Sequence, residues 1–166
     1  MTWERAEAVV HVDATSTIVI DRPPDVVARY ASNPDHVPDW YANISSVEWR
    51  TNPPLTIGSR IAFVAHFLGR RMAYTYEIVE LSANRLVMRT AEGPFPMETT
   101  YSWEPVVGGR TRMTLRNRGT PAGFSRWIAP FMQIAIRRAN GKDLRLLKQR
   151  LERDKHDGEG GNFLLP

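Results

Sequence analysis

The most regular feature of the chain is an alternation of apolar and polar residues from Arg60 to Arg118. Side chains that alternate with a period of two lie on opposite faces of a β-strand. Turn-forming residues interrupt the alternation at 68–70, 82–84, 93–94 and 107–109, which indicates an antiparallel meander. The predicted strands are Arg60–Phe67, Arg71–Leu81, Arg85–Thr90, Met97–Pro105 and Thr111–Arg118.

One face of this predicted meander is apolar and aromatic, and the other is charged. Neighbours of the apolar set, such as Arg89 and Glu98, suit the solvent-facing side of a one-sided sheet. The inward set comprises Ile61, Phe63, Ala65, Phe67, Met72, Tyr74, Tyr76, Ile78, Leu86, Met88, Met97, Thr99, Tyr101, Trp103, Met113, Leu115 and Asn117.

Two short helices are expected before the meander. Asp21 and Asn33 are typical N-cap residues, and prolines follow both where the first turn of a helix tolerates them. The expected elements are a strand from about Val9 to Ile20, a helix ending near Ala31, one more helical turn after Asn33, and a strand at Ile44–Arg50.

A single long amphipathic pattern follows the meander. Its apolar arc comprises Ile128, Met132, Ile136, Ala139, Leu147 and Leu151, and its basic arc comprises Arg137, Arg138, Lys142, Arg145 and Lys148. We expect a helix at Ala129–Asp154, roughly 40 Å long at about 1.5 Å per residue, which is enough to cross a curved sheet. Pro130 is expected to bend this helix or to lie in its first turn.

The composition is that of one globular domain, with 166 residues, 42% of them hydrophobic and 24% charged. No apolar run reaches the roughly 20 residues that span a bilayer, and the first residues do not resemble a signal peptide, so we expect a cytoplasmic protein. The absence of cysteine excludes disulfides and thiol nucleophiles. The net charge of +4 carries no specificity by itself, and no specific nucleic-acid partner is expected.

The stretch 33–41 gathers Asp35, His36 and Asp39 beside Trp40 and Tyr41, and it fits either an acid/base cluster or the plug of a binding cavity. The two carboxylates suit the positive end of a short helix, which favours a structural role for them. The chain has no HExxH or GxSxG motif and no other histidine pair with metal-ligand spacing. We therefore expect no metal and no cofactor.

The order of strand, two short helices, antiparallel meander and long C-terminal helix is that of the helix-grip fold. With this order of elements, the chain resembles the START-like, birch-pollen-allergen-like superfamily, also called SRPBCC. It most closely resembles the polyketide cyclase/dehydrase-like bacterial members of that superfamily. The resemblance is carried by TIVIDRPPDVVARYASNPDHVPDWYANISSVE, YEIVELSANRLVMRT, YSWEPVVGGRTRMTL and the amphipathic helix.

The resemblance implies an α+β fold, in which a curved antiparallel sheet of about seven strands wraps around the C-terminal helix. The expected START-like domain spans residues 9–154, between an N-terminal extension (1–8) and a flexible tail (155–166). The fold implies a cavity between sheet and helix for a hydrophobic or amphipathic small molecule, such as a lipid or a polyketide. The expected ligand-binding residues are Trp40, Tyr41, Phe63, Phe67, Tyr74, Tyr76, Met88, Thr99, Tyr101, Trp103, Met113, Asn117, Met132 and Ile136.

Two other functions stay open at the level of sequence. Tyrosines in a dry cavity could support cyclisation or dehydration of a polyketide, although the sequence offers no clear general base and the catalytic residues stay unassigned. The basic face of the long helix could instead bind acidic lipid head groups, a partner protein or nucleic acid. A homodimer also stays open.

Overall fold

The computed structural model describes residues 10–122 and 127–159. The elements are β1 (Val12–Ile20), α1 (Pro24–Ala31), the 3-10 turn η1 (Pro34–His36), α2 (Val37–Trp40), β2 (Ile44–Trp49), β3 (Arg60–Phe67), β4 (Arg70–Ser82), β5 (Arg85–Glu92), β6 (Met97–Val106), β7 (Arg110–Gly119) and α3 (Ala129–Glu159). Each predicted strand is present, with bounds that differ from the prediction by a few residues at most.

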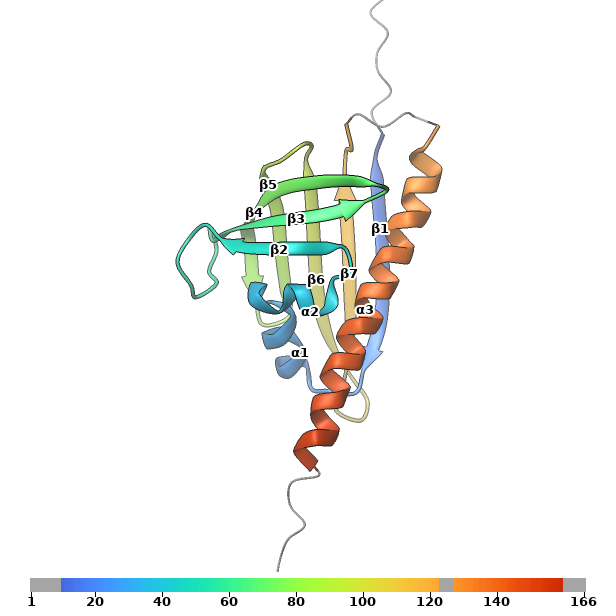
Figure 1. The fold of residues 1–166 in the computed structure, drawn as a ribbon. Helices are drawn as coiled ribbons and strands as arrows, with labels where there is room; N and C mark the ends of the chain where they lie inside the picture. The colour runs from blue at the N-terminus through green and yellow to red at the C-terminus, as the bar shows by residue number, and fades with distance from the viewer. Residues whose placement is uncertain (1–9, 123–126, 160–166) are drawn as a thin grey trace, which may run out of the picture.

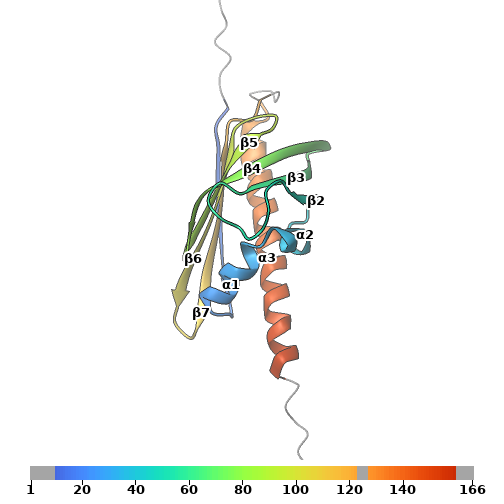
Figure 2. The ribbon, with the colours of Figure 1, turned by 90° about the vertical axis from the view of Figure 1, so that its left-hand side faces the viewer.

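The seven strands form one antiparallel sheet in the order β1-β7-β6-β5-β4-β3-β2. The sheet is strongly curved, so that β2 and β3 run across the direction of β6 and β7 (Figure 1). Seen from the side, α3 lies on the concave side of the sheet, with α1 and α2 below the bend (Figure 2). This arrangement confirms the predicted helix-grip fold.

Helix α3 is held along β1 by polar contacts at both ends. Near its beginning, the Gln133 side chain accepts a hydrogen bond from the Asp13 backbone N–H at 3.2 Å and donates one to the Asp13 carbonyl at 2.5 Å. Further along, Lys148 donates to the Val19 carbonyl at 2.8 Å. These contacts fix the rotation of α3, and with it the set of side chains that faces the sheet.

The two predicted N-caps have different outcomes. Asn33 is confirmed, because its side-chain oxygen accepts a hydrogen bond from the Asp35 N–H at 3.0 Å. The N-cap prediction for Asp21 is wrong, because α1 has Pro23 at the N-cap position and no side-chain cap. Asp21 instead pairs with Lys155 at 3.0 Å, which ties the end of β1 to the last part of α3.

Helix α3 ends at Glu159, five residues beyond the predicted end at Asp154, and Pro130 lies in its first turn. Residues 155–159 of the predicted tail are therefore helical. The rest of that tail (160–166) and the predicted N-terminal extension (1–8) lie outside the described residues.

The outer face of the sheet is charged, as the alternation predicts. Arg89 pairs with Glu98 at 2.8 Å, and Arg118 pairs with the same carboxylate. Both arginines and the glutamate lie on neighbouring strands, in the phase opposite to the buried Thr99 and Tyr101. Arg89 and Glu98 therefore do not reach the concave side.

Candidate functional site: a cavity between the sheet and helix α3

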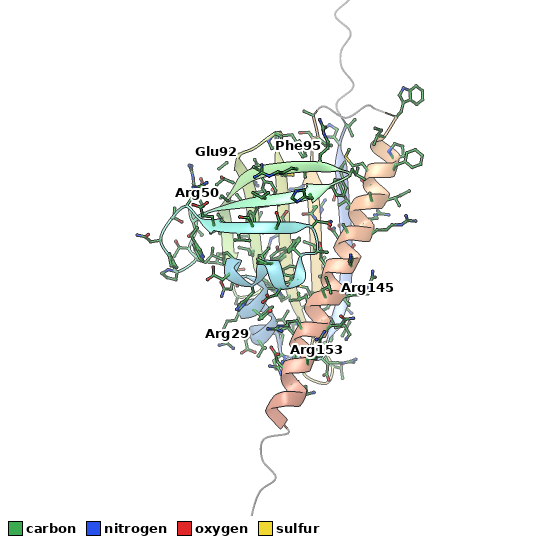
Figure 3. All side chains as sticks on the ribbon, viewed as in Figure 1. Arg29, Arg50, Glu92, Phe95, Arg145 and Arg153 are labelled. Atoms are coloured by element: carbon green, nitrogen blue, oxygen red, sulfur yellow. The ribbon has the colours of Figure 1, made fainter. Side chains whose placement is uncertain are left out.

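A cavity of about 160 Å³ lies between the concave face of the sheet and α3, and it opens to solvent. It extends from Tyr41 and Tyr101 toward the end of the sheet at which α3 begins, where Phe95 lines it (Figure 3). The lining includes these residues from the predicted ligand-binding set: Tyr41, Phe63, Phe67, Tyr74, Tyr76, Met88, Thr99, Tyr101, Asn117, Met132 and Ile136.

Three residues of the predicted set do not line this cavity: Trp40, Trp103 and Met113. All three are at most 2% exposed and belong to the core below the cavity. Helices α1 and α2 pack over that end of the molecule, and α1 contacts β6 and β7, the strands that carry Trp103 and Met113. These three do not reach the cavity because short helices cover the end of the sheet that they occupy. Their contact with a ligand stays a prediction.

Aromatic rings form one wall of the cavity. Phe63 stacks on Tyr74 with ring centroids 5.6 Å apart, and Tyr76 meets both rings edge-on at 5.9 and 5.0 Å. These rings lie on the adjacent strands β3 and β4, where Phe63 is paired directly with Tyr74. The strand pairing thus places the rings side by side, and they form a continuous aromatic surface that faces the cavity.

A chain of hydrogen bonds crosses the cavity floor from the sheet to α3. Tyr76 and Thr99 share a hydrogen bond at 3.0 Å, and Thr99 donates to the Asn117 side-chain oxygen at 2.6 Å. Asn117 Nδ2 then donates to Asn140 Oδ1 at 2.8 Å. Asn140 is 2% exposed, and its Nδ2 has no hydrogen-bond partner among the described residues. A buried donor without a partner is uncommon in proteins, and a bound molecule is one explanation for it.

Two tyrosine hydroxyls meet at the inner end of the cavity. Tyr41 and Tyr101 lie 2.8 Å apart, oxygen to oxygen. Burial raises the pKa of both phenols, and it raises the pKa of Tyr76 to about 12. These tyrosines therefore stay protonated at neutral pH and keep their capacity to donate hydrogen bonds.

Asp143 is the one acidic residue among the described residues that line the cavity, and it is 3% exposed. Its Oδ1 accepts a hydrogen bond from the Ala42 N–H at 3.0 Å, which joins α3 to the chain after α2. Burial raises the pKa of Asp143 to about 6, while the Ala42 N–H and the Lys142 charge oppose that rise. Its carboxyl group therefore titrates close to neutral pH.

The sequence analysis missed both Asn140 and Asp143. They follow Ile136 by four and seven residues, so they lie on the apolar arc of the helix. Two polar side chains on an otherwise apolar arc were the available signal. Such residues on a buried face indicate a satisfied internal contact or a site.

Asp35, His36 and Asp39 do not line the cavity, although Val37 between them does. Asp35 accepts a hydrogen bond from the Trp49 indole at 2.8 Å, and Asp39 accepts one from the Tyr30 hydroxyl at 2.9 Å. The His36 ring stacks on Tyr30 with centroids 4.1 Å apart. Each of the three side chains has a local partner, so the interpretation of the stretch as an acid/base site loses its basis.

Within residues 10–122 and 127–159, no group of three or more histidine and acidic side chains is arranged to hold a metal ion. In the same described ranges, no helix is both long and apolar enough to cross a bilayer.

A comparison with protein families gives one match, to a family described as polyketide cyclase / dehydrase and lipid transport, over residues 11–152. The chain belongs to this family. The match covers every strand from Val12 onward, α1, α2 and most of α3, so the family assignment includes all the elements that form the cavity. It also confirms the resemblance inferred from the sequence.

Solved structures share the fold at low sequence identity. A protein of Thermus thermophilus has a TM-score of 0.75 at 21% identity, covering 86% of this chain and 98% of its own. The Zhui aromatase/cyclase from a Streptomyces species has a TM-score of 0.72 at 14% identity, covering 86% and 94%. A START superfamily protein from Mycobacterium smegmatis has a TM-score of 0.73 at 12% identity, covering 85% and 97%. Among curated protein sequences the chain has no significant match.

Proposed function

We propose that the protein binds a hydrophobic or amphipathic small molecule in the cavity between the sheet and α3. The observation that carries this proposal is an aromatic cavity in which one buried donor, Asn140 Nδ2, has no partner in the described chain. Small-molecule sites generally combine apolar walls with a few placed polar groups. The family's description, which includes lipid transport, agrees with such a ligand.

The lining suggests the form of the ligand. Its apolar part would lie on Phe63, Tyr74 and Met88, and an oxygen atom would accept from Asn140. A closed cavity of about 150 Å³ accommodates benzene. This cavity is of similar volume and opens to solvent, so it suits a molecule of one or two rings or a short chain that extends toward the opening. The fluorescent compound 2-naphthol, with two fused rings and one hydroxyl, is a suitable probe.

Native mass spectrometry and solvent extraction of the purified protein test this proposal directly. We expect a bound molecule, or a rise in melting temperature with at least one of 2-naphthol, fatty acids, sterols and aromatic polyketides. If the protein carries no molecule and no compound of the panel changes the melting temperature, the proposal is wrong.

A second candidate function is cyclisation or dehydration of a polyketide-like substrate. The observation that favours it is Asp143, a buried carboxyl group beside the tyrosine pair whose pKa of about 6 suits proton transfer near neutral pH. We expect Asp143→Asn to abolish turnover of a competent polyketone while binding is retained, and Tyr101→Phe to reduce turnover. Equal rates for wild type and Asp143→Asn would remove this candidate.

Asp143→Asn is also expected to make folding stability less sensitive to pH. Because the pKa of the folded state lies above that of an unfolded aspartate, proton binding favours the folded state, and this stabilisation is lost as the pH rises through about 6. Relative to wild type, the variant should therefore gain roughly 2–3 kcal/mol between pH 4 and pH 8, measured by urea denaturation.

The control for this experiment is Asp25→Asn, which changes an exposed carboxylate paired with Arg29. Its effect should stay below about 1 kcal/mol at either pH. If the free energy of unfolding of Asp143→Asn, relative to that of wild type, does not increase between pH 4 and pH 8, the account of Asp143 is contradicted.

A further inference from the structure

The outer side of α3 carries an unusual concentration of exposed apolar side chains. The described residues include seven large hydrophobic side chains that are strongly exposed, and four of them lie within residues 127–134. Trp127 is 75% exposed and Phe131 is 71% exposed. Single exposed hydrophobic residues are ordinary, but a cluster of large ones marks an interaction site.

These side chains begin a stripe that continues along the helix as basic residues. Residues at steps of three and four lie on one helix face, and the stripe follows such steps on α3 from Phe131 to Arg145, while Trp127 lies in the turn just before the helix. Its members, named here the outer stripe, are Trp127, Phe131, Ile134, Arg138, Lys142 and Arg145. All six are exposed, and Arg145 is labelled on α3 in Figure 3. The stripe is therefore apolar at its beginning and cationic further along.

The contacts of α3 with β1 hold the outer stripe away from the protein. Gln133 is hydrogen-bonded to Asp13, and the neighbouring Met132 is 2% exposed and lines the cavity. Phe131 and Ile134 must therefore point outward on the same turns. The apolar end of the stripe consequently lies beside the part of the cavity that Met132 and Phe95 line.

The charge of α3 is also one-sided. Between Ala129 and Gln149 the only acidic residue is Asp143, which is buried and faces the cavity. The ion pairs of the described part of α3 lie further along, between Lys148 and Glu152 and between Lys155 and Asp21. Among the described residues, Arg138, Lys142 and Arg145 thus have no acidic partner at salt-bridge distance.

We propose that the outer stripe docks the protein on the surface of an anionic phospholipid bilayer. In this arrangement Trp127, Phe131 and Ile134 enter the interfacial region, and Arg138, Lys142 and Arg145 contact lipid phosphates. Exposed Trp and Phe beside Lys and Arg on a helix are the features that bind such an interface. The docking needs no ligand in the cavity, so it stands independently of the proposed function.

Two other occupants explain the observations less well. A second copy of the chain would bring two basic stripes together, and the stripe has far fewer residues than the roughly 20–30 that each side of a standard protein interface contributes. Binding to nucleic acid would explain the basic residues, because Lys and Arg pair with backbone phosphates. It would leave the exposed Ile134 and Phe131 without a role.

Co-sedimentation with vesicles tests the proposal. The intact protein is mixed with vesicles of phosphatidylcholine alone, or of equal parts phosphatidylcholine and phosphatidylglycerol, at about 100 mM and about 500 mM salt. We expect binding to the anionic vesicles at the lower salt concentration, at least about tenfold tighter than to neutral vesicles. Bilayer-embedded brominated lipids should quench tryptophan fluorescence in wild type, and Trp127→Phe should lose this quenching.

Two variants and one control separate the outer stripe from the rest of the surface. Phe131→Ser and the double change Arg138→Glu with Arg145→Glu should each weaken vesicle binding by about tenfold or more. Val107→Ser alters an 88% exposed side chain in the β6–β7 turn, at the other end of the molecule, and should leave binding unchanged (Figure 1). Circular dichroism of each variant checks that it is folded.

Three results would overturn the proposal. The first is that the protein does not bind vesicles, or that it binds them equally well with and without the changes in the outer stripe. The second is a dimer, detected by light scattering, that Phe131→Ser disperses while vesicles stay unbound. The third is binding to a DNA duplex that depends on the arginines and not on Phe131, without binding to vesicles.

Discussion

Replacing Ala65 by phenylalanine is expected to weaken the binding of 2-naphthol by about a hundredfold or more. Ala65 lies on β3, is 7% exposed and lines the cavity. A cavity of about 150 Å³ accommodates one benzene ring, so a phenyl group from residue 65 would take much of the volume of about 160 Å³. The ring would occupy existing space, so the fold should be kept. Fluorescence titration measures the affinity.

Ala91→Phe is the matched control for this prediction. It adds the same group to an exposed alanine on β5, outside the cavity lining, and should leave the affinity for 2-naphthol within about twofold of wild type. Unchanged binding by a folded Ala65→Phe protein would show that the probe binds elsewhere.

Replacing Trp40 by alanine is expected to destabilise the protein by about 3–5 kcal/mol. Trp40 is completely buried, and its ring lies 5.7 Å from that of Tyr101 and 4.3 Å from that of Tyr41, centroid to centroid. Removing the indole leaves a large void between α2 and the sheet, which α2, at four residues, is too short to close. Urea denaturation measures the change in the free energy of unfolding.

Two further tryptophan variants separate core packing from other effects. Trp40→Phe should cost less than Trp40→Ala, because it keeps a ring and removes an indole N–H that has no partner in the described chain. Trp127→Ala, on the surface, should change stability by less than about 0.5 kcal/mol. If Trp40→Ala loses less than about 1 kcal/mol but no longer binds 2-naphthol, Trp40 belongs to the ligand site, as the sequence analysis proposed.

The strands and their faces could be predicted because each depends on local sequence. Alternation with a period of two assigns Phe63, Tyr74, Thr99 and Tyr101 to one face whatever the tertiary structure, and a one-residue shift would expose all of them. The long helix was similarly evident from its apolar arc. These two patterns were sufficient to place most of the cavity lining.

What the sequence did not reveal depends on contacts between distant segments. Whether Trp40 meets ligand or core is decided by how α1 and α2 pack against the sheet, which no local pattern specifies. Asp143 was missed because its partner, the Ala42 N–H, lies 101 residues earlier in the chain. Asp21 was assigned to a helix cap because its actual partners, Glu152 and Lys155, lie 131 and 134 residues later in the chain.

The basic arc of α3 was recognised from the sequence, but its meaning changed with the structure. From the sequence alone, this face could bind acidic lipid head groups, a partner protein or nucleic acid, and nothing distinguished among them. The exposure of Trp127 and Phe131, in line with Arg138 and Arg145, could be established only once the rotation of α3 about its axis was fixed by Gln133 and Lys148. The outer stripe is therefore a property of the packed helix.

The central claim is that a small molecule binds between the sheet and α3, and a crystal structure of the protein with saturating 2-naphthol tests it most directly. The account predicts density for the rings against Phe63 and Tyr74, with the hydroxyl oxygen within hydrogen-bonding distance of Asn140 or Asp143. A structure in which side chains fill the cavity, or in which 2-naphthol lies only on the surface, would contradict it.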